Sequence, residues 1–505
     1  MKEKFLQKYE SKIQRFFEII PGFLTWLVLT SPIWLGRPLP LVAAFFLTFL
    51  VLFWVYRAVI HIIGLFVGYR RYKKELQIDW VEKLKLLGEN SFTTKHLILV
   101  PVASEKYQVL KETVTAIANQ TYPKDKIYLL LSIEERGGEE LLRDIKQLKE
   151  ELKGKIPNFW FSLHPAGLPS EVVGAAANRT WGAKDAAARL EKQGENLDNF
   201  LLTTFDADGI IHPQFLSRLT YEYLTTKGRE NHFYQTAVHL YDNNLWQVPP
   251  LMRIQANSVT LAVLSSWTFE AHLKDTWSCF SIALTTLINV NYWDVTLGID
   301  DTPFFWRAFF KKKGDFSGRT FYIPISSDAV QGKGFLDSHV SQYKQLLRWG
   351  WGVIVFPIAM RGFLTIPEIP FRQKLLQVFK MIEQYTIWRT ITFLLTFGFP
   401  LLLFFNPKLR TTALGYNLPR LTGYILTLAL VFLLPATAIR EKIVKEKPKD
   451  WPWWKKVLTY LEGPLVIVNL LTYVFVPYVD AETRMMLGRK FEFKTTPKIR
   501  QNKKH

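Results

Sequence analysis

The chain has 505 residues, a formal net charge of +20, and a composition that is 49% hydrophobic and 15% aromatic. Its single cysteine, Cys279, excludes internal disulfides and any metal cluster built from cysteines. The excess of Lys and Arg lies along the flanks of apolar segments, so it favours a cytoplasmic membrane face with anionic lipid and argues against nucleic acid as a partner.

Apolar segments gather at the two ends of the chain. A helix needs about 20 apolar residues to cross a bilayer, and residues 39–69 provide them. Residues 22–35, extended back through 16–20, form a weaker first span. Three more spans are expected at 385–405, 421–439 and 457–479. The sequence therefore predicts a multi-pass protein of the plasma (inner) membrane, with its polar middle part in the cytoplasm.

The number of crossings near the C-terminus stays open. Three spans there place the tail 481–505 outside, whereas its many basic residues favour the inside. In one interpretation, 457–479 is broken at Gly463-Pro464 and re-enters the membrane instead of crossing it. In another, 352–360 contributes a further crossing.

The middle of the chain alternates between two kinds of segment. Short, continuously apolar runs are typical of strands buried on both faces of a parallel sheet, and they occur at 96–103, 127–133, 158–164 and 200–206. Helix-like segments lie between them at 105–119, 139–153 and 171–192. This alternation predicts a doubly wound α/β domain that binds ligands at the C-terminal ends of its strands.

The first acidic motif, Asp206-Ala207-Asp208, stands where the fourth predicted strand ends. Positions i and i+2 of a strand face the same side, so two carboxylates there can share Mg²⁺ or Mn²⁺ together with substrate phosphates. The alternative is that they are only the polar end of a buried strand.

The second acidic motif is Asp300-Asp301, which precedes Thr302-Pro303. Thr302 is a plausible cap and Pro303 fits a first helical position. Both carboxylates then lie at the positive end of a helix. Such a carboxylate in a cleft can accept a proton from an attacking hydroxyl; alternatively, both residues only stabilise the helix terminus.

The third motif is Gln345-Leu-Leu-Arg348-Trp349, whose three polar or aromatic members share one helix face. An arginine can pair with phosphate through two hydrogen bonds, and a tryptophan ring is a surface on which a sugar can stack. The alternative is an interfacial helix, where Trp and Arg are ordinary membrane anchors.

In this order, the motifs resemble those of the family-2 membrane glycosyltransferases, which include the cellulose, chitin and hyaluronan synthases. The resemblance covers roughly 95–350. It implies an α/β GT-A (nucleotide-diphospho-sugar transferase, Rossmann-like) catalytic domain at 92–340, flanked by transmembrane helices. The remaining parts would be a cytoplasmic N-terminus with two spans at 1–75, interfacial helices at 341–380, C-terminal spans at 381–480 and a basic tail at 481–505.

The resemblance also implies roles for particular residues. Asp301 would be the catalytic base, with Asp300 beside it. Asp208 would hold the divalent cation together with Asp206. Donor contacts would come from Ser104, Glu105, Glu134, Asn178, Asp206 and Arg348, and acceptor contacts from Gln345 and Trp349. Glu171 and Gly174 match the segment that carries Asn178.

Two departures from the family pattern affect the donor pocket. Ala175 stands where the family often has a lysine, and the turn after the second strand reads EERGG at 134–138. These changes affect which nucleotide and which sugar the resemblance implies, more than they affect the class of reaction.

The function that the resemblance implies is inverting transfer of a sugar from a nucleotide-sugar, of the UDP type, to a growing cell-surface polysaccharide. It requires a divalent cation and a saccharide or lipid-linked acceptor, and it allows a homo-oligomer or an accessory export subunit. Two alternatives stay open. One is a single transfer to a lipid-linked acceptor, and the other is a non-catalytic membrane scaffold that keeps the same domain.

Overall fold

The computed structural model describes residues 9–489, which form two compact units. The sheet unit comprises Val67–Leu245 and Ala262–Ala329. The helical unit takes the described residues of Met1–Phe66, Trp246–Leu261 and Val330–His505. Two of the boundaries fall inside long helices, α4 (Pro40–Leu76) and α10 (Pro250–Glu270), and the other two fall in loops. The N-terminal residues 1–8 and the end of the basic tail, 490–505, lie outside the described part of the chain.

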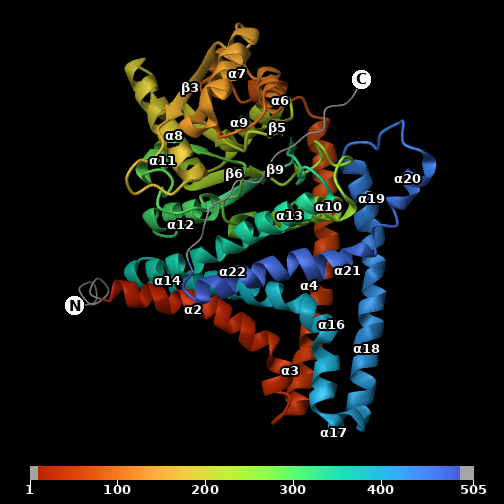
Figure 1. Ribbon diagram of the computed structural model, residues 1–505. Coiled ribbons are helices and arrows are strands. Elements are labelled where there is room, and N and C mark those ends of the chain that lie inside the picture. The colour runs from red at the N-terminus through yellow and green to blue at the C-terminus, as the bar shows by residue number, and fades with distance from the viewer. Residues whose placement is uncertain (1–8, 490–505) are drawn as a thin grey trace. The chain divides into compact units, whose positions relative to one another are not determined.

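The sheet unit is built on a seven-stranded mixed sheet with the strand order β3-β2-β1-β4-β8-β6-β9 (Figure 1). The first four strands of the chain are mutually parallel neighbours. β8 is antiparallel to both β4 and β6, and β9 is parallel to β6. The strands are β1 (Lys95–Val102), β2 (Ile127–Glu134), β3 (Asn158–His164), β4 (Phe200–Thr204), β6 (His232–Thr236), β8 (Phe280–Ala283) and β9 (Ser317–Phe321).

The four strands predicted from apolar runs are therefore confirmed: β1, β2 and β4 are almost wholly buried, whereas β3, at the edge of the sheet, is partly exposed. The fourth is shorter than predicted: β4 ends at Thr204, before Asp206. The antiparallel half of the sheet was not predicted. Neither was a small second sheet of β5 (Ile210–Ile211), β10 (Ile325–Ser326) and β7 (His239–Leu240), in that spatial order.

Helices cover the main sheet on two sides. One face carries the apolar residues of β1 and β2 that pack against α5, α6, α7 and α9. The opposite face carries α8 (Ala175–Lys192), where a Cβ added to Gly182 would lie 2.7 Å from Cβ of Ser132 and 2.9 Å from Cδ1 of Leu99. The helices of this unit are α5 (Trp80–Lys85), α6 (Tyr107–Ala118), α7 (Gly138–Glu151), α8, α9 (Phe215–Thr225), α11 (Leu284–Asn289) and α12 (Asp301–Lys311).

Within residues 9–489, four helices are long and apolar enough to cross a membrane: Pro40–Leu76, Phe371–Phe405, Ala413–Ile443 and Leu465–Met486. They include the apolar segments predicted at 39–69, 385–405 and 421–439, and the last overlaps 457–479. The weaker first span falls on α2 (Glu10–Leu29), which is not among the four. Its Glu10, Arg15 and Glu18 lower its apolar character.

The helical unit has its own apolar core. The N-terminal half of α4 packs through Ala43, Leu47 and Leu50 against Leu394 and Leu402 of α16. The helices of this unit are α2, α3 (Ser31–Trp34), α13 (Phe335–Gly350), α14 (Val355–Thr365), α15 (Phe371–Ile382), α16 (Trp388–Phe405), α17 (Pro407–Arg410), α18 (Ala413–Ala429), α19 (Leu433–Ile443), α20 (Trp453–Leu458), α21 (Leu465–Asn469) and α22 (Val476–Met486).

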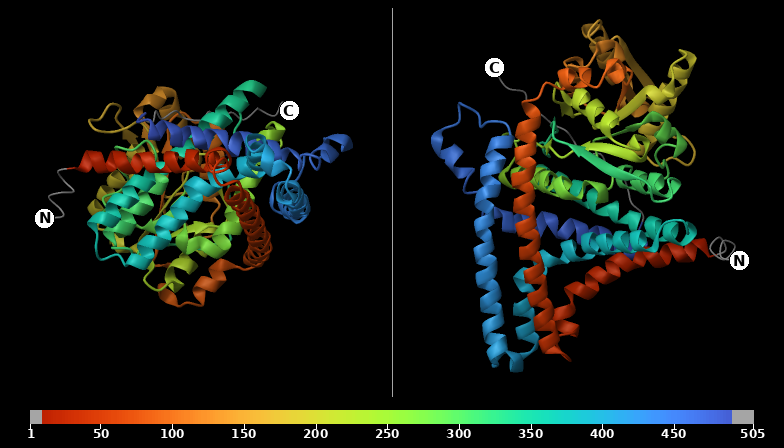
Figure 2. Two further views of the ribbon diagram at one scale, coloured as in Figure 1. Left: turned by 90° about the horizontal axis from the view of Figure 1, so that it is seen from below. Right: turned by 180° about the vertical axis from the view of Figure 1, so that it is seen from behind.

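Two directions of helix occur in this unit. α16 and α18 run side by side, joined at one end through α17, whereas α22 runs across the direction of α18 (Figures 1 and 2). Both interpretations of the C-terminal crossings stay predictions.

Candidate active site

The site is built from acidic residues that follow strands of the sheet unit. Asp206 and Asp208 come after β4, where the amide N–H of Gly209 donates to the carbonyl oxygen of Asp206 at 2.8 Å and turns the chain. Because the strand has already ended, the two side chains do not share a strand face. The side chain of Asp206 is 50% exposed, whereas Asp208 is 3% exposed.

Asp208 is fixed by the small second sheet. Its Oδ2 accepts from the backbone N–H of Asp328 at 2.9 Å, and its carbonyl oxygen accepts from Nδ2 of Asn243 at 3.0 Å. Asp328 follows β10 and Asn243 follows β7, so the pairing of these two short strands holds the carboxylate. This support was not predicted, because strands of two residues leave no pattern in the sequence.

His239 of β7 is a further buried group near the acidic motif. It is hydrogen-bonded to Oγ of Ser327 at 2.9 Å and stacks on Tyr241 with ring centroids 4.8 Å apart. Burial lowers its pKa to about 4, although the charges of Asp208 and Asp206 act in the opposite direction. The imidazole is therefore neutral at pH 7.

Asp300 and Asp301 stand at the start of α12. Asp300 is the N-cap residue and Asp301 is the first helical residue, so the expectation that Thr302 caps the helix was wrong. The carbonyl oxygen of Asp301 accepts from Oγ1 of Thr276 at 2.5 Å. Both carboxylates lie at the positive end of the helix macrodipole, as the sequence indicated.

One guanidinium joins the two acidic motifs. Arg179 of α8 is 1% exposed; its Nη2 donates to Oδ1 of Asp206 at 3.1 Å, and its Nη1 donates to Oδ1 of Asp301 at 3.1 Å and to Asp300. Burial by itself lowers the pKa of Arg179, but the carboxylates of Asp300, Asp301 and Asp206 outweigh it and the net shift is upward. The guanidinium is therefore a permanent cation at the centre of the site.

Sequence reasoning missed Arg179. It lies next to the predicted donor residue Asn178, on a helix whose neighbouring positions are mostly alanine and glycine. A long cation on a helix face made otherwise of small side chains is the signal that was available. Its partners are 27, 121 and 122 positions away, which no local pattern reveals.

Asn178 connects the ends of two strands. Its Nδ2 donates to the carbonyl oxygens of Val102 at 3.3 Å and Ser132 at 2.9 Å, while Oγ of Ser132 donates to the carbonyl oxygen of Asn178 at 2.8 Å. These bonds place the first turn of α8 at the C-terminal ends of β1 and β2. Arg179 and its carboxylates therefore lie at this same edge of the sheet.

Three more of the predicted donor residues, Ser104, Glu105 and Glu134, also lie at this edge. Glu105 accepts from the backbone N–H groups of Ala103 and Ser104 at 2.7 and 3.0 Å and closes the turn after β1. Glu134 is the last residue of β2; it is 7% exposed and pairs with Arg136. Beside it lies a cavity of about 80 Å³ that is also lined by His164 and Glu171, which are hydrogen-bonded to each other at 2.8 Å.

Gln345, Arg348 and Trp349 belong to the helical unit, where all three lie on α13 and are half-buried. Oε1 of Gln345 accepts from Nε2 of Gln342 at 3.4 Å. Close packing fixes the end of this helix, because a Cβ on Gly350 would lie 2.8 Å from Cβ of Ala481 of α22. The helix is confirmed, and the roles of the three residues stay predictions.

Carboxylate oxygens suit Mg²⁺ or Mn²⁺, which bind proteins through only one or two carboxylates when a substrate supplies phosphates. Asp206 and Asp208 are the two carboxylates that the sequence predicted for this role. In the described part of the chain, no three His, Cys, Asp or Glu side chains form a cluster able to hold a metal ion alone.

The chain matches no protein-family profile and no curated protein. Among solved structures, it is similar to the mannosyltransferase PcManGT from Pyrobaculum calidifontis in complex with GDP-Man and Mn²⁺, with 12% identity and a TM-score of 0.42 over 88% of this chain and 98% of that chain. It is also similar to S. aureus TarS 1-349 in complex with UDP-GlcNAc, with 13% identity and a TM-score of 0.33 over 79% and 94%. At TM-scores this low, the likeness assigns no function to this chain.

Proposed function

We propose that the protein is an inverting glycosyltransferase with a GT-A fold, which transfers a sugar from a nucleotide-sugar to a growing cell-surface polysaccharide at the plasma membrane. The observation that supports this most is the meeting of Asp206, Asp300 and Asp301 at the Arg179 guanidinium. Two motifs far apart in the sequence thus share one place at the C-terminal edge of parallel strands, where α/β folds bind ligands.

Asp301 is the proposed base. One of its carboxylate oxygens accepts the proton of an acceptor hydroxyl, and that hydroxyl oxygen attacks the anomeric carbon of the donor sugar. The bond from the anomeric carbon to the donor diphosphate breaks, and its electron pair leaves with the nucleoside diphosphate. One displacement from the opposite face inverts the configuration.

Asp206 and Asp208 are the residues that would hold a divalent cation. When bound there with the donor diphosphate, the cation would supply charge neutralisation of the leaving group. Arg348 would pair with the departing diphosphate, and Gln345 and Trp349 would position the acceptor. Ser104, Glu105, Glu134 and Asn178 would shape the site for the nucleoside, of uridine type.

The direct test is a screen of purified full-length protein with UDP-sugars and GDP-sugars, first for hydrolysis and then for transfer. A radiolabelled donor that gives a ladder of products supports polymer synthesis. A product with a single added sugar supports one transfer to a lipid-linked acceptor instead. If the protein unfolds cooperatively but hydrolyses none of the donors, the result supports the alternative of a non-catalytic membrane scaffold.

A further inference from the structure

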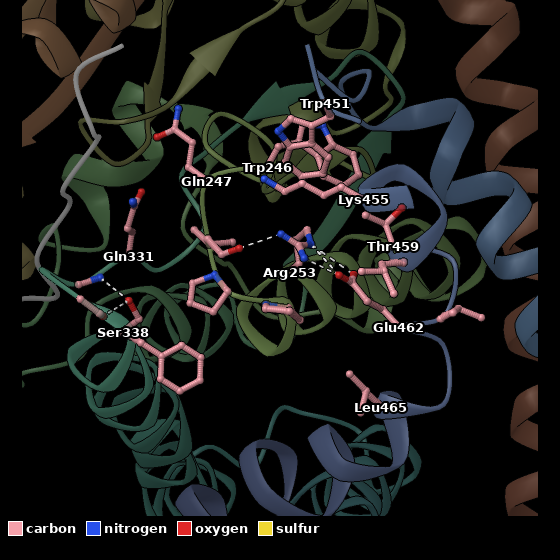
Figure 3. Close-up of a pocket in the computed structure, with 18 of the residues that line it drawn as sticks. Trp246, Gln247, Arg253, Gln331, Ser338, Trp451, Lys455, Thr459, Glu462 and Leu465 are labelled. Carbon is pink, nitrogen blue, oxygen red and sulfur yellow. Dashed lines mark hydrogen bonds and ion pairs between the residues drawn. The ribbon is translucent and has the colours of Figure 1, made fainter. Parts of the chain in front are cut away.

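The helical unit contains a cavity of about 650 Å³, which lies within the range of about 300–1,000 Å³ that is typical of small-molecule sites. Three segments far apart in the sequence line it: the loop before α10 and its first turn, the loop before α13 and its first turn, and α20 with the residues up to Leu465. In Figure 3, Gln247, Gln331 and Ser338 lie on one side of the opening, and Trp451, Lys455 and Thr459 lie on the other.

The walls of this cavity are mostly apolar. Trp246 and Trp451 contact each other edge to face with ring centroids 5.7 Å apart, and Nε1 of Trp246 donates to the carbonyl oxygen of Lys445 at 2.9 Å. Large apolar side chains at the cavity are also exposed, at 64% for Phe335, 53% for Trp454 and 63% for Leu461. Exposed apolar side chains beside a cavity indicate a surface that another apolar phase covers.

The charge at the cavity is positive. Four lining residues are ionisable: Arg253, Lys333, Lys455 and Glu462. Arg253 and Glu462 form a buried ion pair, with Nε of Arg253 3.2 Å from both carboxylate oxygens, so they neutralise each other (Figure 3). Lys333 and Lys455 remain as an excess of two positive charges, and both are exposed. Nζ of Lys455 lies 3.9 Å from the ring centroid of Trp451, an indole that also faces the cavity.

Two apolar helices end beside the cavity. Leu465, which lines it, is the first residue of the apolar helix Leu465–Met486, and Ile443, the last residue of Ala413–Ile443, precedes Lys445 closely. The connection between them includes the stretch Trp451-Pro-Trp-Trp-Lys-Lys456. Tryptophan and lysine next to spans are the residues that concentrate at the boundary between hydrocarbon and water.

From these observations we propose that the cavity binds one amphiphile with a phosphate headgroup, taken from the membrane boundary. Its hydrocarbon lies against Trp246, Trp451 and Leu465, and its phosphate is attracted by the ammonium groups of Lys333 and Lys455. The apolar walls favour a ligand with a hydrocarbon part over a free polar anion, and the two lysines favour an anionic lipid over a neutral one. The proposal goes beyond sugar transfer and does not depend on it.

The test is lipid retention by the full-length protein, measured by native mass spectrometry after incubation with phosphatidylglycerol, a prenyl phosphate, phosphatidylcholine or inorganic phosphate. The probe variant is Lys333→Glu with Lys455→Glu. The matched control is Lys449→Glu with Lys456→Glu, which makes the same change of charge on lysines outside the cavity. We expect one phosphate amphiphile on the wild type and on the control, and roughly tenfold weaker binding by the probe variant.

The incubations with phosphatidylglycerol and with prenyl phosphate identify the kind of lipid that is bound. Retention of phosphatidylglycerol indicates a bulk phospholipid, and preference for prenyl phosphate indicates a carrier lipid. Equal retention by probe and control variants would overturn the proposal. So would retention of phosphatidylcholine as strong as that of phosphatidylglycerol, or binding of inorganic phosphate alone. If the charge-reversed protein does not fold, Lys333→Ala with Lys455→Ala serves instead, since alanine fits both exposed positions.

Discussion

Arg179 donates to Asp206 across 27 positions of sequence, from a side chain that is 1% exposed to one that is 50% exposed. The cation therefore lies in the interior and one of its anions lies at the surface. A ligand that reaches Asp206 from solvent therefore meets a carboxylate whose negative charge is already partly compensated by the buried guanidinium of Arg179. This relationship makes Arg179 the part of the site whose removal has consequences for both folding and function.

Replacing Arg179 by alanine is expected to lower the free energy of unfolding by up to about 3–5 kcal/mol, because three clustered carboxylates, two of them only partly exposed, lose their common cation. Arg179→Lys is expected to recover only part of this loss, since one ammonium cannot reproduce the forked geometry. Thermal unfolding in detergent measures both. Arg189→Ala on the same helix is the matched control: its ion pair with Asp185 is partly exposed and is expected to contribute about 1 kcal/mol or less. Equal losses of unfolding free energy in the two alanine variants would show that Arg179 stabilises the fold no more than a partly exposed arginine does.

Asp301→Asn is expected to reduce sugar transfer by about 10²–10⁴-fold while leaving donor binding nearly unchanged, because the amide cannot accept the proton. Initial rates with a radiolabelled donor and titration calorimetry separate the two effects. Asp300→Asn removes a neighbouring carboxylate from the same guanidinium and is the control for lost charge. Transfer by Asp301→Asn at the wild-type rate would remove Asp301 as the base.

Asp208→Asn is expected to abolish the dependence of nucleotide binding on Mg²⁺ or Mn²⁺. The amide oxygen still accepts from the N–H of Asp328, so the turn is kept while the negative charge is lost. Calorimetric titration of UDP and GDP, with and without the cation, provides the measurement. A variant that still binds nucleotide in a cation-dependent way would contradict the role given to Asp208.

Acidification is expected to destabilise the sheet unit through His96 of β1. Burial lowers its pKa to about 3, and it is hydrogen-bonded to Oγ1 of Thr220 at 2.7 Å. Because the unfolded chain takes up the proton near pH 6.5 and the folded chain does not, the stabilisation is present above pH 6.5 and is lost as the pH falls toward 3. The slope for one such group is at most about 1.4 kcal/mol per pH unit.

Thermal unfolding of the full chain at several pH values tests this, with His96→Gln as the variant and His272→Gln as the control. His272 lies in the same unit on a short helical turn and is not buried. We expect the His96 variant to be less stable at pH 7 but to depend less on pH between 6.5 and 3. Curves of equal slope for the wild type and this variant would contradict the assignment.

The sequence predicted those parts of the fold that rest on local pattern. β1 to β3 were found within one or two residues, because their apolar runs are almost continuous. The second sheet escaped prediction because β5, β7 and β10 have two residues each, and their pairing depends on contacts far apart in the chain.

In the candidate site, too, the features that rest on local sequence patterns were predicted, and those that depend on distant contacts were not. The acidic motifs at 206–208 and 300–301 were visible as short patterns beside predicted elements. Asp206 and Asp208 differ in exposure because β4 ends before them, and a run of apolar residues in the sequence does not specify where the strand ends. Arg179 became apparent only when its three carboxylates were placed together in space.

Gly182 lies three residues beyond Arg179, on the same side of α8, and no Cβ fits between it and Ser132. The helix thus rests on the sheet at a place where a single added methyl group would act as a wedge. Such a wedge is expected to displace the preceding turn, which carries Arg179, relative to its carboxylates. The spacing of the candidate site is therefore set in part by a residue that has no side chain and lies outside the cluster of charges.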